Sequence, residues 1–211
     1  MLLASGRGSE IYALDGGRVL RRFKAGGDPH REAEVMRYAR SRGFPVPQVL
    51  DVMDDALVLE RIPGPTMGAL LRRWPWLLPA QAAELARLHR LLHTIGAPPG
   101  SPVAGPGDRL VHLDLHPENV LVTSAGPVVI DWTNAAMADG ALDVALTWVV
   151  LATSGGTGGS LFCRFFLRHF ERGSLVGALP RAAAFRLADR NVTDGERDRV
   201  RRLLERYCAP D

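Results

Sequence analysis

The segment from Val111 to Val122, VHLDLHPENVLV, limits the possible folds more than any other part of the chain. It sets His112, Asp114 and Asn119 in an HxDxxxxN pattern between two apolar runs. A second apolar run, VVI, begins nine residues after Asn119 and ends at Asp131. We expect the aspartate to lie on a tight loop and the asparagine to return as the chain re-enters a strand, so that both side chains converge.

These residue types suit phosphoryl transfer. Such a reaction needs a carboxylate that orients and deprotonates the attacking hydroxyl, and oxygen ligands that hold Mg²⁺ against the nucleotide phosphates. Asp114 suits the first task, and Asn119 and Asp131 suit the second. Asp, His, Pro and Asn are also ordinary turn residues, so a purely structural turn is the alternative. The two segments together favour a phosphotransfer site.

Length and hydropathy indicate a globular chain. With 211 residues and 46% hydrophobic content, it can bury a substantial core in one large domain or in two small lobes around a cleft. No apolar run approaches the roughly 20 residues of a membrane span, and polar residues from Ser5 onward interrupt the N-terminus too early for a signal peptide. We therefore expect a cytoplasmic protein without a membrane partner.

Charge and cysteine content argue against a nucleic-acid-binding protein and against a cysteine metal site. The net charge of +3 and the pI near 9.3 come almost wholly from arginine, because Lys24 is the only lysine. The basic stretch Arg197–Arg206 is interleaved with acidic residues, which favours a solvated helix face over a nucleic-acid contact. Cys163 and Cys208 have no metal-binding spacing, so we expect reduced thiols, with a disulfide as the alternative.

The first 61 residues predict a small antiparallel sheet with one helix. Asp15-Gly16-Gly17 is a hairpin turn, because glycine tolerates positive φ. The helix has Pro at its first turn, early glutamates, late arginines and Gly43 as a stop. The expected order is strand 11–14, strand 18–23, helix 29–42, strand 46–52 and strand 56–60.

The rest of the chain predicts mainly helices. Ile62-Pro63-Gly64-Pro65 reads as a linker, and residues 97–108, rich in Pro and Gly, as a loop. Amphipathic spacing predicts a helix over 79–95, on which His89 and His93 are expected to be packed or capping residues, and a second helix is expected over 141–153. The run 154–160 lacks the Lys-Ser/Thr of a phosphate loop, which favours a flexible joint.

Eight segments, in this order, resemble the aminoglycoside phosphotransferase and choline kinase branch of the protein-kinase-like fold. They cover roughly residues 5 to 150: SGRGSEIYAL, RVLRRF, REAEVMRYARSRGFPVPQVL, LVLERIPG, LARLHRLLH, VHLDLHPENVLV, VVIDW and DGALDVA. The resemblance implies an α+β, bilobal protein-kinase-like fold, with a nucleotide-binding lobe over 1–61 and a catalytic and acceptor-binding lobe over 62–211. It also implies ATP, with GTP possible, Mg²⁺ and a small-molecule hydroxyl acceptor.

The resemblance carries roles to individual residues of the larger lobe. It implies that Asp114 is the catalytic base and that Asn119 and Asp131 bind magnesium. It further implies that His112 and Asp143 brace the catalytic loop. The alternative for Asp143 is an ordinary negative charge at a helix N-terminus.

In the smaller lobe, the resemblance implies that Arg21 contacts the α and β phosphates and that Glu32 holds it. The family's usual residue here is lysine, but arginine stays charged and can bind phosphate in a bidentate manner. Alternation along the strand puts Val19 on the face of Arg21, where it could line the adenine pocket. One alternative is that Arg21 is an ordinary surface residue. Another is that Lys24 is the phosphate-binding cation.

Three further contacts follow from the resemblance. The turn Ser5-Gly6-Arg7-Gly8-Ser9 would cover the phosphates, since glycine allows backbone amides to approach closely. The Glu60 carbonyl and the Ile62 amide would bond the adenine edge. Trp132 would pack behind the metal site.

Two rival functions can be weighed. A protein Ser/Thr kinase is disfavoured, because only eleven residues separate Asp131 from Asp143, too few for a long activation segment. A nucleotide-binding scaffold without catalysis is also disfavoured, because it has no physical need to keep Asp114, Asn119 and Asp131 together. The acceptor is not named by the sequence, but eleven arginines against seven acidic residues from Val150 to Asp211 argue against a polycation.

Overall fold

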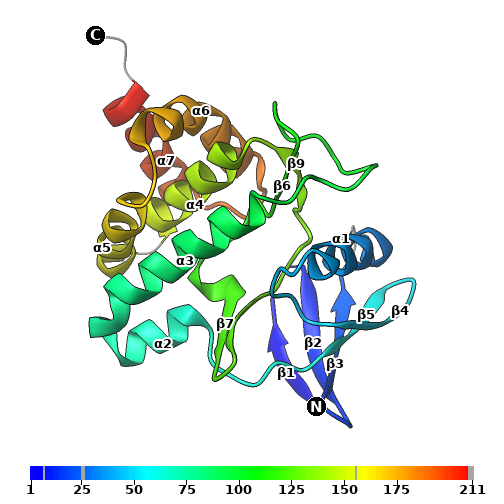
Figure 1. The fold of residues 1–211 in the computed structure, drawn as a ribbon. Helices are drawn as coiled ribbons and strands as arrows, with labels where there is room; N and C mark the ends of the chain where they lie inside the picture. The colour runs from blue at the N-terminus through cyan, green and yellow to red at the C-terminus, as the bar shows by residue number, and fades with distance from the viewer. Residues whose placement is uncertain (7, 25–26, 155, 209–211) are drawn as a thin grey trace.

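The computed structural model describes residues 1–6, 8–24, 27–154 and 156–208, which form a small sheet-based lobe and a larger, mainly helical lobe (Figure 1). The small lobe is a five-stranded sheet in the order β1-β2-β3-β5-β4, and each neighbouring pair is antiparallel. Its elements are β1 (Leu2–Ser5), β2 (Ser9–Leu14), β3 (Arg18–Phe23), α1 (Pro29–Ser41), β4 (Val49–Val52) and β5 (Ala56–Glu60).

Local signals place α1 accurately. Asp28 is its N-cap and accepts a hydrogen bond from the Arg31 amide at 3.0 Å, and Pro29 occupies the first turn. The helix packs against β4 and β5, which brings Glu32 in its first turn next to the sheet. The expected helix is confirmed, and it ends one residue before the position predicted.

The sheet contains one strand that the sequence did not predict. All four residues of β1 are exposed, so this edge strand has no buried face and no alternation of apolar and polar residues that would predict it. β4 is shorter than expected and begins at Val49, because Val46 enters the core outside the ladder. The other expected strands are confirmed.

The larger lobe surrounds α4 with helices. Its helical elements are α2 (Met67–Arg73), η1 (Pro75–Leu77), α3 (Leu78–Leu92), η2 (Pro117–Asn119), α4 (Gly140–Ser154), α5 (Gly156–Leu167), α6 (Arg172–Ala188) and α7 (Asp194–Cys208). Helix α4 contacts α3, α5, α6 and α7. Two small antiparallel ribbons complete the lobe: β6 (Arg109–Val111) with β9 (Ala136–Ala138), and β7 (Val120–Thr123) with β8 (Gly126–Val129).

The predicted joint over 154–160 does lie between two helices, but its described residues are helical and do not form a loop. Ser154 ends α4, and Gly156 to Ser160 form the first turns of α5; Gly155 lies outside the described residues. Glycine disfavours a helix by about 1 kcal/mol relative to alanine. Packing of α5 against α3 and α4 overrides that local preference.

One hydrophobic core runs through both lobes. Phe44, which follows α1, packs edge-on against Trp132 of the larger lobe, with ring centroids 5.5 Å apart, and both residues are buried. The loop Ile62–Pro65 leads from β5 to α2 without forming a helix or strand, as predicted for a linker. The lobes therefore meet through tightly packed side chains close to Asp131.

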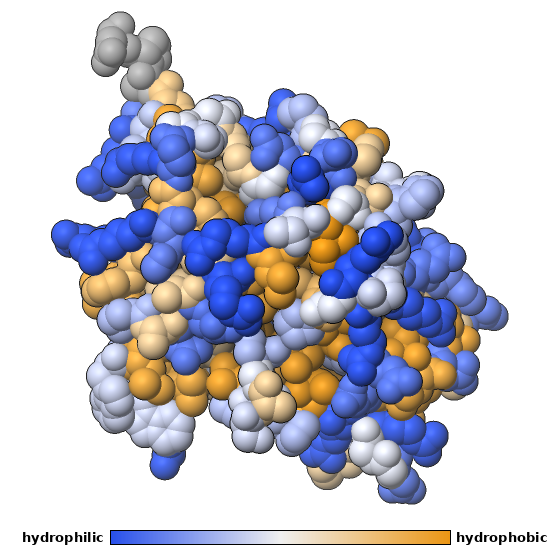
Figure 2. All heavy atoms as spheres, viewed as in Figure 1, coloured by the Kyte–Doolittle hydropathy of each residue, from blue (hydrophilic) through white to orange (hydrophobic). Residues whose placement is uncertain are grey.

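The surface and the cysteines agree with the sequence where they are described. Polar and charged side chains are interspersed with apolar ones on the face shown in Figure 2. Cys163 and Cys208 are both free thiols. Over the described part of the chain, no helix is both long enough and apolar enough to cross a membrane.

Candidate active site

The HxDxxxxN loop leaves β6 in a strained conformation that a buried carboxylate supports. Leu113 has a φ of 59°, in the left-handed region that non-glycine residues rarely adopt. Asp143, from the first turn of α4, accepts hydrogen bonds from the Leu113 amide at 2.7 Å and from the His112 amide at 3.2 Å. Its side chain is fully buried. Asp143 thus holds the backbone immediately before Asp114.

Asp143 stays charged despite its burial. Burial alone would raise the pKa of its carboxyl, but the hydrogen bond with His93 Nε2 at 3.0 Å helps to hold the pKa well below its usual value. The carboxylate therefore accepts charge-assisted hydrogen bonds, which are stronger than neutral ones. Such bonds suit a group that must hold a strained loop.

His112 connects this loop to the chain that precedes Asp131. Burial lowers the pKa of His112, so the ring is neutral near pH 7. Its Nδ1 accepts from the Asp114 amide at 3.2 Å, and its Nε2 therefore donates to the Ile130 carbonyl at 3.1 Å. The ring also packs against Trp132, with centroids 4.9 Å apart. His112 thus ties together the two segments that the sequence singled out.

Asp114 and Asn119 meet, as the spacing predicts. The Asn119 amide nitrogen donates to the Asp114 backbone carbonyl at 2.9 Å and to its carboxylate at 3.0 Å. With its nitrogen turned to Asp114, Asn119 has its side-chain oxygen available for a cation. His116 adds a contact that the sequence analysis missed: its Nε2 lies 3.3 Å from the Asp114 carboxylate.

Asp131 also has left-handed backbone geometry, with a φ of 66°. Its Oδ1 accepts from Arg21 Nη2 at 2.5 Å and lies 3.1 Å from Thr133 Oγ1. Burial disfavours the charged carboxylate, but Arg21 outweighs this and lowers the pKa of Asp131. Asp131 is therefore anionic, as a magnesium ligand needs to be.

Arg21 is buried between the lobes, which contradicts the surface alternative. It is 7% exposed, pairs with Glu32 through Nη1, and donates from Nε to Ser9 Oγ at 3.1 Å. Burial raises the pKa of Glu32, although Arg21 opposes that shift. Lys24 is exposed and donates instead to the Gly6 carbonyl at 2.8 Å, which holds the glycine turn rather than the site.

The charges around Arg21 favour a divalent cation. One guanidinium pairs with Glu32 and Asp131, and the Asp114 carboxylate lines the same cleft, so these four side chains have a formal charge of −2. Hard oxygen donors with excess negative charge are the donor set that Mg²⁺ prefers. The residues present therefore fit the ion that the sequence predicted.

These side chains open onto one cleft of about 1440 Å³ between the lobes. The expected site residues that line it are Gly6, Gly8, Arg21, Asp114, Asn119 and Asp131. Glu32, His112 and Asp143 are buried behind it. Arg7 lies outside the described residues.

Four expected nucleotide contacts are not among the residues lining this cleft. Ser5 is exposed at the end of β1, and Val19 is half-buried opposite Leu59. The Glu60 side chain accepts from the Gln48 amide at 3.1 Å, and Ile62 follows in the linker. Their contacts with a nucleotide remain predictions.

Thr133 is a second residue that the sequence analysis missed. Its hydroxyl donates to Glu32 at 2.9 Å, accepts from Arg21 Nη2 at 3.0 Å and lies 3.1 Å from Asp131 Oδ1. Its position two residues after Asp131 was the only available signal, and threonine is common after turns. Thr133 links all three charged partners.

Comparison with protein families places these features in context. A family model described as "Phosphotransferase enzyme family" matches residues 2–110 and 105–185. A curated relative from Archaeoglobus fulgidus, "Probable serine/threonine-protein kinase BUD32 homolog", is 28% identical over 122 residues. That match covers 58% of this chain and 50% of the relative, so it spans half of the relative's length.

Solved structures share the fold over nearly the whole chain. A choline/ethanolamine kinase family protein from Mesorhizobium loti has a TM-score of 0.71 at 19% identity, covering 97% of this chain and 88% of that one. The aminoglycoside phosphotransferase APH(4)-Ia, in a ternary complex with AMP-PNP and hygromycin B, has a TM-score of 0.75 at 18% identity, covering 100% and 94%. At these identities the structures establish the bilobal α+β fold.

Proposed function

Because the chain belongs to the phosphotransferase enzyme family, we propose that it transfers the γ-phosphoryl group of ATP to a hydroxyl of a small molecule, with Mg²⁺. GTP is the alternative donor. The observation that carries the proposal is the convergence of Asp114, Asn119, Asp131 and Arg21 on one cleft, with the strained loops braced from behind.

Each residue has a distinct task. Asp114 orients the acceptor hydroxyl and accepts its proton, a role worth about 10²–10⁴ in rate. The Asn119 amide oxygen and the Asp131 carboxylate would hold Mg²⁺, which offsets charge on the phosphates. Arg21 binds phosphate oxygens in a bidentate manner while Glu32 keeps its guanidinium in place. His112 and Asp143 act on the loop backbone and not on the substrate.

The far wall of the cleft suggests what kind of acceptor fits. It is apolar, with Leu146, Val150 and Leu151 from α4, Phe162 from α5 and Phe185 from α6. Of the described carboxylates lining the cleft, all but Asp114 pair with an arginine: Glu118 with Arg72, Asp131 with Arg21 and Asp189 with Arg186. An alcohol with an apolar body fits these walls better than a polycation does.

A mass-shift screen tests the proposal. Purified protein, ATP and Mg²⁺ are incubated with pooled alcohols, sugars, nucleosides, amino alcohols and aminoglycosides, and phosphorylated products are identified. We expect one pool to gain a phosphate, and Asp114→Asn to lower kcat by about 10²–10⁴ while the nucleotide Kd stays unchanged. Asp54→Asn, an exposed carboxylate on the smaller lobe, is the matched control.

Three outcomes would contradict the proposal. Wild-type kcat in Asp114→Asn would remove this carboxylate from the reaction. Tight Mg²⁺-dependent ATP binding with no product in any pool would favour the non-catalytic scaffold. Phosphorylation of a protein substrate, but of none of the small molecules, would favour the Ser/Thr kinase that the Archaeoglobus relative suggests.

A further inference from the structure

Two histidines that the sequence analysis treated as packing residues lie beside the carboxylate that braces the catalytic loop. His89 lies in the last turn of α3, His93 is the C-cap residue of that helix, and Asp143 lies opposite them on α4. One ligating atom from each residue lies within 4.8 Å of the others. His93 Nε2 is 3.0 Å and His89 Nδ1 is 3.5 Å from Asp143 Oδ2. Neighbouring ligand atoms of a tetrahedral zinc ion, with bonds of about 2.0–2.1 Å, are about 3.3 Å apart.

His89 Nδ1 is the decisive atom. Its side chain is completely buried, and no described residue forms a hydrogen bond with this atom. Thr147 Oγ1 lies 2.8 Å from the Leu115 carbonyl and 3.1 Å from His89 Nε2. The threonine has one proton, and the shorter contact directs it to Leu115. His89 Nε2 must then donate to Thr147, which leaves a lone pair on Nδ1.

That lone pair faces a carboxylate. His89 Nδ1 points toward Asp143, whose carboxylate accepts hydrogen bonds from the Leu113 and His112 amides. A lone pair 3.5 Å from a carboxylate oxygen in a buried site is electrostatically unfavourable unless a cation lies between them. The arrangement therefore has the polarity of a metal site.

The surroundings resemble the outer shell of such a site. Metal-bound histidines usually donate their other ring nitrogen to an oxygen, as His89 does to Thr147. Ligating carboxylates are usually hydrogen-bonded, as Asp143 is to two backbone amides. Phe166 packs on the His89 ring at 5.4 Å. The side chain of His93 is 15% exposed, which gives an ion a route in.

We propose that His89 Nδ1, His93 Nε2 and Asp143 Oδ2 form a binding site for one zinc ion, separate from the proposed Mg²⁺ site. Two imidazoles and one carboxylate favour Zn²⁺ over Mg²⁺, which prefers oxygen ligands. A water molecule from the His93 side completes the tetrahedron. Because Asp143 also holds the Leu113 and His112 amides, zinc here stiffens the loop that presents Asp114.

Metal stoichiometry tests the site without reference to activity. The full-length protein is stripped with a chelator, dialysed against Zn²⁺ in excess Mg²⁺, and its bound zinc is counted by mass spectrometry. We expect one zinc per chain, a tetrahedral absorption spectrum with Co²⁺, and a rise in Tm of about 5–10 °C when zinc is a hundredfold above its Kd.

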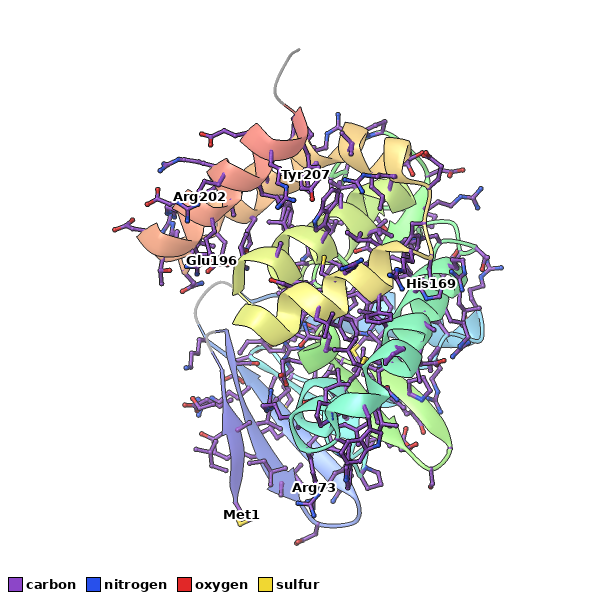
Figure 3. The ribbon with its side chains drawn as sticks, turned by 90° about the vertical axis from the view of Figure 1, so that its left-hand side faces the viewer. Met1, Arg73, His169, Glu196, Arg202 and Tyr207 are labelled. Atoms are coloured by element: carbon purple, nitrogen blue, oxygen red, sulfur yellow. The ribbon has the colours of Figure 1, made fainter. Side chains whose placement is uncertain are left out.

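Variants locate the ion. The His93 side chain is partly exposed, so His93→Gln should fold, yet it should lose the bound zinc. Thr147→Val should weaken zinc binding about 10–100-fold. His169→Gln is the matched control, because this histidine is exposed beyond the end of α5 and outside the cluster (Figure 3). Asp131→Asn should keep its zinc, which separates this site from the proposed function.

Two results would overturn the inference. Folded wild-type protein that binds no zinc would show that only a proton occupies the gap between His89 and Asp143. Equal zinc content in wild type and His93→Gln would place the ion elsewhere.

Discussion

Replacing Arg21 by methionine tests whether the buried ion pair joins the two lobes. The Arg21 and Glu32 side chains are 8% and 1% exposed, so neither charge is solvated by water. Removing one partner of such a pair costs about 3–5 kcal/mol, because it leaves an unpaired buried charge. Glu32 would keep hydrogen bonds from Thr133 at 2.9 Å and from the Trp132 amide at 3.1 Å. We therefore expect Arg21→Met to lose about 3 kcal/mol, at the lower end of that range.

Urea unfolding followed by tryptophan fluorescence measures this loss. For a chain of this size, about 3 kcal/mol corresponds to a fall in Tm of about 6–12 °C. The double variant Arg21→Met/Glu32→Gln should be less destabilised than Arg21→Met alone, since the unpaired charge is gone. Exposed Arg22→Met, whose pair with Asp55 lies on the surface, should change stability by less than about 1 kcal/mol.

The pH dependence gives an independent check. A carboxyl whose pKa is raised in the folded state destabilises the protein as pH rises, and removing Arg21 raises the pKa of Glu32 further. The loss in Arg21→Met should therefore shrink as the pH falls toward 5. A loss below about 1 kcal/mol at pH 7, or strict additivity in the double variant, would refute this reasoning.

Three other perturbations test separate parts of the fold. Asp143→Asn should cost about 2–4 kcal/mol in urea unfolding. Because the pKa of Asp143 is depressed when folded, the wild type loses this contribution as the pH falls below about 4, so the two acid-unfolding curves should converge there. Gly64→Ala should lose about 1–3 kcal/mol of unfolding free energy, since φ is +144° and a Cβ would lie 2.2 Å from the Val122 carbonyl oxygen. The control Gly177→Ala in α6 should instead stabilise the protein, because its Cβ meets no atom within 4 Å. Equal urea midpoints for the two variants would contradict this. Burial raises the pKa of Cys163 to about 12, so a thiol reagent should label only Cys208 before unfolding and both cysteines after it.

The sequence predicted those parts of the fold that local chemistry determines. Helix α1 begins where Asp28 and Pro29 signal a start, and β3 aligns Arg21 with the site because strand alternation is strict. β1 escaped detection because an exposed edge strand has no buried face to reveal it. The start of α5 was misread because neighbouring helices, and not its glycines, determine its conformation.

The site divides in the same way. The HxDxxxxN spacing sufficed to bring Asp114 and Asn119 together, since five residues of chain join them. Thr133 and the His89–His93–Asp143 cluster could not be found from sequence. Their contacts join positions as much as 112 residues apart, and single threonines and histidines carry no pattern of their own.

The position of Arg21 implies that the nucleotide and the proposed Mg²⁺ ion would depend on each other. Its guanidinium is bound to Asp131, so a phosphate that takes Arg21 releases the Asp131 carboxylate. A cation that takes Asp131 releases Arg21 in turn, while Glu32 keeps the arginine in place through its second nitrogen. Each exchange frees the group that the other ligand needs. Binding of the two ligands should therefore be cooperative in this chain, because each one alone would leave a charge near the lobe interface without its partner.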